Sequence, residues 1–185
     1  MDLTSEGTPT PCGSCGATGT TFGWAFSVTS PITVNGIGIF DTGADGLGGS
    51  FEAGLYTSAG VLLRSATISD LSTVVASAAV TGQWLFESVI PIVLPAGDYI
   101  IGSVFNDSLP LAAVGAPFTT IPSITFTGGV TSPSFDTGLQ APTSPFGFPI
   151  FGPTLDAAEI PEPATASLFA FALAAVLARR RLSRQ

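Results

Sequence analysis

Apolar and polar residues alternate along several short stretches of the chain, which is the pattern of strands that bury one face. The clearest stretch runs from Thr20 to Thr29, where Phe22, Trp24 and Phe26 fall on the same face. Further stretches of strand length lie at residues 32–41, 52–69, 83–94 and 97–105. The alternation therefore predicts an all-β protein.

Glycines mark the places where these strands turn or bulge. The tripeptide Ser58-Ala59-Gly60 divides residues 52–69 into the two halves of a hairpin, and Asn35-Gly36 predicts a bulge in the strand at residues 32–41. The run from Leu94 to Tyr99 resembles the tyrosine corner of Greek-key sandwiches, in which the tyrosine hydroxyl bonds to nearby backbone. These signals favour a jelly-roll-like, Greek-key β-sandwich.

The pattern loosens after residue 105. Residues 124–129 and 148–155 predict two more strands, and residues 132–148, rich in proline, serine and glycine, predict a loop. We therefore expect a sandwich domain at residues 20–157, after a flexible segment at residues 1–19.

The end of the chain follows a different pattern. Residues 164–178 are uncharged and apolar without a polar face, which predicts a transmembrane helix; the alternative, a terminal core helix, would have to be buried all round. Such a helix is about 22 Å long. Snorkelling arginines and local thinning can close the gap to a hydrocarbon core of about 30 Å. A basic stop at residues 179–184 follows, formed by Arg179, Arg180, Arg181 and Arg184.

Two prolines and an acid, Pro161, Glu162 and Pro163, precede this run and hold the backbone extended. With the Pro-Glu-Pro motif first, the apolar run second and the arginine cluster last, residues 158–185 resemble the PEP-CTERM sorting signal of Gram-negative bacteria. The resemblance implies an exosortase, an integral-membrane cysteine peptidase, that cuts near the motif. The body would be anchored in the inner membrane before processing, and would then reach the cell surface or extracellular matrix, where such proteins often accompany exopolysaccharide.

The body carries a second resemblance to the same family. Residues 23–155, with the segments GWAFSV, IGIFDTGADGL, GLYTSAGVLL and AGDYIIG, resemble β-sandwich domains that recur in PEP-CTERM proteins and are largely without an assigned function. Family members normally begin with a secretory leader. Residues 1–16 show neither the basic start nor the apolar stretch of such a leader.

The distribution of charge also separates the body of the chain from its C-terminal tail. It has 13 acidic residues and 5 arginines, with no lysine or histidine, and a net charge of −8. Arg64 is the single base before Arg179, so the body is strongly acidic and would repel nucleic acid. Without histidine, a Ser-His-Asp triad is impossible, and we expect no enzymatic activity.

One acidic stretch resembles a calcium-binding loop. Asp41, Asp45, Gly46 and Glu52 match four positions of the EF-hand pattern, while Gly43 stands where a third ligand would be. The alternative is a glycine-rich connection whose aspartates cap turns. No other cofactor is indicated.

Two further features have a structural and a functional interpretation. Cys12 and Cys15 form a CxxC motif without a helix start or further zinc ligands, which favours a local disulfide or two free thiols. Trp84 and Tyr56 could form a sugar-binding platform if they face solvent, but burial in the core is the expectation for both. Taken together, we expect an exported, non-enzymatic surface or matrix protein; the alternative is a calcium-dependent carbohydrate-binding module.

Overall fold

The computed structural model describes residues 2–3, 19–78, 81–104, 118–133, 138–147 and 152–160. The predicted sorting motif, transmembrane helix and basic stop at residues 161–184 lie outside these ranges, as do Cys12 and Cys15. Within them every regular element is a β-strand. The described ranges include no helix with the length and apolar character needed to cross a membrane.

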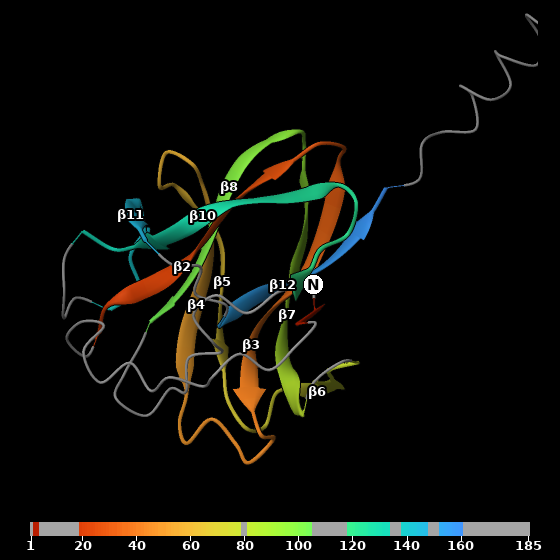
Figure 1. Ribbon diagram of the computed structural model, residues 1–185, viewed down its shortest axis with the longest axis vertical. Helices are drawn as coiled ribbons and strands as arrows, with labels where there is room; N and C mark the ends of the chain where they lie inside the picture. The colour runs from red at the N-terminus through yellow and green to blue at the C-terminus, as the bar shows by residue number, and fades with distance from the viewer. Residues whose placement is uncertain are drawn as a thin grey trace, which may run out of the picture.

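The strands form two large antiparallel sheets and one small one (Figure 1). The six-stranded sheet has the order β11 (Ser144–Phe146), β10 (Ile124–Thr131), β2 (Thr21–Val28), β8 (Gly97–Val104), β4 (Phe51–Thr57) and β5 (Leu62–Ile68). The four-stranded sheet has the order β12 (Pro153–Glu159), β3 (Ile32–Thr42), β7 (Gly82–Leu94) and β6 (Thr73–Ala76). The small sheet pairs β1 (Asp2–Leu3) with β9 (Phe118–Thr119).

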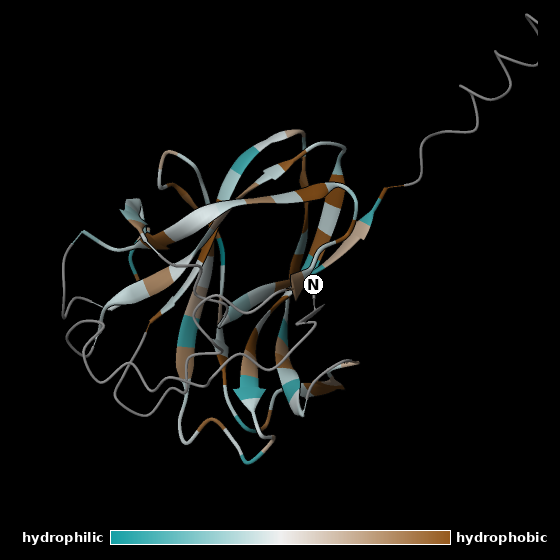
Figure 2. Ribbon diagram, in the orientation of Figure 1, coloured by the Kyte–Doolittle hydropathy of each residue, from teal (hydrophilic) through white to brown (hydrophobic). Residues whose placement is uncertain are grey.

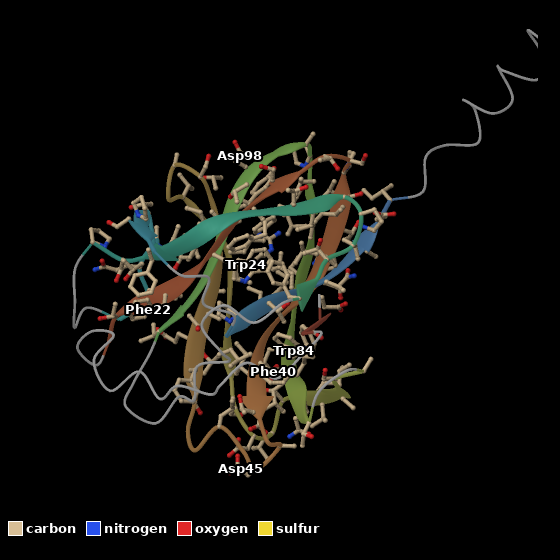
Figure 3. The ribbon with its side chains drawn as sticks, in the orientation of Figure 1. Phe22, Trp24, Phe40, Asp45, Trp84 and Asp98 are labelled. Atoms are coloured by element: carbon tan, nitrogen blue, oxygen red, sulfur yellow. The ribbon has the colours of Figure 1, made fainter. Side chains whose placement is uncertain are left out.

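A single large core joins the two main sheets. It holds Phe22, Trp24 and Phe26 from β2 together with Ile37 and Ile39 from β3, all at most 2% exposed. Each such side chain stabilises the fold by about 1.5–3 kcal/mol on burial. The Trp24 indole Nε1 donates a hydrogen bond of 2.7 Å to the Pro153 carbonyl, so a polar contact also ties β2 to β12 inside the core (Figure 3).

The predicted turn, bulge and tyrosine corner are confirmed. The hairpin of β4 and β5 turns at residues 58–61, where Gly60 adopts a φ of 83°. The pairing of β3 with β7 shifts register between Val34 and Gly36. The Tyr99 hydroxyl donates to the Pro95 carbonyl at 3.1 Å, which joins the start of β8 to the end of β7.

The prediction for the last part of the body is partly wrong. The segment expected to be a loop contains β11, whose three residues pair with β10. The last strand begins at Pro153 and continues to Glu159, beyond the apolar stretch that predicted it. Both strands lie at sheet edges, and most of their side chains are half-buried or exposed, so burial does not impose an apolar alternation on them.

A row of glycines crosses the outer face of the six-stranded sheet. Gly23, Gly102 and Gly54 are direct neighbours on β2, β8 and β4. A Cβ at Gly102 would lie 2.7 Å from Pro142 Cγ, because residues 138–143 pass over this row. The Thr21 hydroxyl fastens this segment by donating to the Gly138 carbonyl and accepting from the Gln140 N–H. The glycines therefore let a connecting segment lie flat on the sheet.

Candidate functional site

The acidic loop predicted to bind calcium connects β3 to β4 at one end of the molecule. It turns through four residues of positive φ, Gly43 (83°), Ala44 (57°), Gly46 (101°) and Gly48 (69°). Leu47, 1% exposed, anchors it in the core. Glycine at three of these positions removes the strain that a side chain would meet in this conformation.

Asp41, near the end of β3, holds the loop in place through its buried side chain. Its carboxylate is fully buried, and Oδ2 accepts hydrogen bonds from the Gly46 N–H at 3.1 Å and from Gln83 Nε2 at 2.9 Å. Its Oδ1 is also buried, and no residue in the described ranges forms a hydrogen bond with it. Asp41 therefore acts as a cap for the turn, which is the alternative that the sequence left open.

Asp70 is a second carboxylate at this loop, and sequence reasoning missed it. Its Oδ1 accepts the Leu47 N–H at 2.6 Å, and its carboxylate would lie 3.3–3.4 Å from a Cβ at Gly46. The residue follows β5, far along the chain from the loop, and no local motif links the two. A bare glycine at Gly46 thus serves two purposes: it adopts positive φ and gives room to Asp70.

The other predicted calcium ligands do not join Asp41. Asp45 is exposed at the tip of the loop (Figure 3), and Glu52 is exposed on β4 opposite Thr67. Across the described ranges, no three His, Cys, Asp or Glu side chains are grouped so that they could hold a metal ion. Asp41, Asp45 and Glu52 therefore do not make a three-carboxylate site in this structure.

A groove of about 360 Å³ crosses the four-stranded sheet. All four strands line it: β12 with Leu155, Asp156 and Ala157, β3 with Gly36, β7 with Trp84, Phe86, Glu87 and Ser88, and β6 with Thr73, Val75 and Ala76. Its volume is in the range of about 300–1,000 Å³ that is usual for small-molecule sites. The lining combines aromatic rings with carboxylates and hydroxyls.

Glycines of β3 shape the floor of this groove. A Cβ at Gly38 would lie 2.6 Å from Phe86 Cδ1, so the half-buried ring of Phe86 rests directly on the backbone of β3. Asp156 lies beside Gly36 on the other side, 3.3 Å from the position of a Cβ there. An aromatic surface and an exposed carboxylate thus face the same space.

The two aromatic residues considered for a sugar-binding platform are buried, as expected. Trp84 is 2% exposed and packs edge-on against Phe40, with ring centroids 4.7 Å apart (Figure 3). Tyr56 is 3% exposed and lies on the outer face of the six-stranded sheet. Burial, and secondarily the charge of Glu52, raises the pKa of Tyr56 to about 12. Neither ring offers an open face for stacking.

The chain was compared with family models, curated proteins and solved structures. No family model, no curated protein and no solved structure matches it.

Proposed function

We propose that this chain is an exported, non-enzymatic component of the cell surface or extracellular matrix, sorted through its C-terminal segment. The observation that carries the proposal is the order of three parts: Pro161-Glu162-Pro163, the apolar run at residues 164–178, and the four terminal arginines. An exosortase-type peptidase would be the processing partner, and the inner membrane the site of anchoring before the cut. The body would be a jelly-roll-like sandwich.

The position of the last strand supports this proposal. β12 ends at Glu159, and the Ile160 N–H donates to the Pro31 carbonyl at 3.3 Å. All strands that the structure describes in the two large sheets therefore precede Pro161. A cut at residues 161–163 would leave the hydrogen bonds of both sheets in place. Extended backbone between two prolines is also the conformation that a peptidase cleft accepts.

The test is the mass of the C-terminal peptide of the native protein, taken from membrane and extracellular fractions of the cells that make it. We expect an extracellular chain that ends near Pro163, and a Glu162→Ala variant that stays in the membrane fraction. Asp45→Ala, an exposed acid in the loop after β3, is the control and should be processed normally. A chain found in the cell alone and still ending at Gln185 would overturn the proposal.

The groove on the four-stranded sheet favours a second function, binding of a neutral saccharide. The half-buried Phe86 ring offers an apolar surface, while Asp156, Ser88 and Thr73 supply hydroxyl and carboxylate partners around it. This combination suits a sugar ring, which has apolar C–H faces and a polar rim. Exopolysaccharide would then be the ligand of the mature body.

A titration with neutral oligosaccharides, read by tryptophan fluorescence because Trp84 lines the groove, tests this second function. We expect Asp156→Ala to weaken binding and Asp98→Ala, an exposed acid on the six-stranded sheet, to leave it unchanged. The titration is run with calcium and with chelator, since a calcium-dependent carbohydrate-binding module is the alternative that the sequence left open. Equal affinity of all variants would rule out the groove as the site.

A further inference from the structure

The two large sheets have four edge strands, and three of them carry a residue that discourages pairing with another strand. β11 has Pro145, β12 has Pro153, Asp156 and Glu159, and β5 has Arg64. Prolines and charges at edges are the usual protection against edge-to-edge association. β6, the fourth edge, reads Thr-Val-Val-Ala and has neither.

β6 is also apolar and open to solvent. All four of its residues are exposed, with Val74 at 53% and Val75 at 47%. Leu71, just before the strand, is 97% exposed. Residues 71–86 contain no charge, in a body that is otherwise strongly acidic. Figure 1 shows β6 at the margin of the molecule, and Figure 2 colours it as hydrophobic.

Part of the β6 backbone faces away from β7, where none of the described strands pairs with it. The Ser77 N–H bonds to the Gly82 carbonyl at 3.3 Å, and Ala76 lies opposite Gln83. Hydrogen-bonded and non-bonded pairs alternate along an antiparallel ladder, so Thr73 and Val75 bond to β7. The N–H and C=O groups of Val74 and Ala76 therefore point away from β7. Such an edge can be satisfied by another extended strand.

We propose that β6 pairs antiparallel with β6 of a second copy of this chain, about a two-fold axis at Val74. In this register Val74 lies opposite Val74 of the partner, and Thr73 lies opposite Val75. The two four-stranded sheets would join into one continuous sheet, with the same face on the same side in both copies.

A second copy is the occupant that fits this edge. The register is self-complementary: each cross-strand pair at its centre joins uncharged, β-branched residues, which favours pairing. The net negative charge elsewhere on the body would repel another copy of itself. Residues 71–86 form a long uncharged stretch, so this edge is where two copies can approach at low electrostatic cost.

Sedimentation equilibrium of the full chain in mild detergent tests the proposal. We expect a monomer–dimer equilibrium in the native protein. Val74→Lys places two like charges opposite each other and should raise the dissociation constant by about tenfold or more. Val93→Lys is the matched control, because Val93 on β7 is equally exposed at 54% and should dimerise like the native chain.

A cross-link locates the contact and separates it from association through residues outside the sandwich. Opposite residues of a hydrogen-bonded pair have Cα atoms about 5.5 Å apart, within the range of a disulfide. In a Cys12→Ser, Cys15→Ser background, Val74→Cys should form a disulfide-linked dimer under oxidation and Val93→Cys should not. A native chain that is monomeric at all concentrations, or a dimer unaffected by Val74→Lys and without the Val74→Cys cross-link, would overturn the proposal.

Discussion

Tyr56 is a buried polar residue whose hydroxyl makes no hydrogen bond with any residue that the structure describes. Its ring is nevertheless well packed on the outer face of the six-stranded sheet. An unsatisfied buried hydroxyl costs about 1–3 kcal/mol. We therefore expect Tyr56→Phe to raise the free energy of unfolding by about 1 kcal/mol, measured by denaturant titration. Tyr99→Phe should have the opposite effect, because the Tyr99 hydroxyl bonds to Pro95.

The same residue should make the protein sensitive to alkali. Its pKa is raised to about 12 in the folded state, against 10.0 for a free tyrosine, because burial disfavours the phenolate. The unfolded chain ionises at Tyr56 from about pH 10 while the folded protein does not, so the protein loses stability as the pH rises from 10 toward 12 and loses none through Tyr56 below pH 10. We expect Tyr56→Phe to flatten the fall of melting temperature over this range. A variant with an unchanged alkaline fall would contradict the assignment to Tyr56.

At the scale of elements, the row formed by Gly23, Gly102 and Gly54 leaves the space in which residues 138–143 cover the outer face of the six-stranded sheet. A Cβ at Gly102 would lie 2.7 Å from Pro142 Cγ and 2.9 Å from Thr21 Cγ2, contacts that real Cβ atoms do not make. We expect Gly102→Ala to cost about 1–3 kcal/mol, the usual penalty of overpacking, in thermal or denaturant unfolding.

Gly128 provides the matched control for this substitution. It also lies in the six-stranded sheet, on β10, but a Cβ there would meet nothing within 4 Å. Gly128→Ala should change stability by no more than about 0.5 kcal/mol. Equal effects of the two substitutions would show that backbone freedom, rather than the overlying segment, explains the glycine row.

The elements that the sequence predicted well are those whose inner face contributes large apolar side chains to the core. Alternation gave β2, β3, β7 and β8 nearly to their ends, because the core selects every second side chain. β6 was not predicted, because all four of its residues are exposed and neither of its faces has to be apolar. The end of β12 was also misjudged, because the strand continues through Asp156 and Glu159, which are exposed at the sheet edge.

At the scale of the whole molecule, what the sequence could not predict is which distant segments meet. That Asp41 and Gly46 belong to one glycine-rich connection could be predicted, since their spacing is local. Gln83, which donates to Asp41, comes from β7, and Asp70, which accepts from the Leu47 N–H, comes from the connection after β5. Only the closed sandwich brings both to this loop. The groove has the same origin, because its lining comes from the β6–β7 pair and from the distant strands β3 and β12.

The bond between Trp24 and the Pro153 carbonyl spans 129 positions of the chain, and it carries a consequence for biosynthesis. While the protein is still on the ribosome, β3 has an open edge until β12 has been made. Non-local pairing of this kind forms slowly, so the nascent chain exposes apolar strands that attract chaperones. β12 is the last strand in the described part of the chain, so the four-stranded sheet is completed only when this strand docks beside β3.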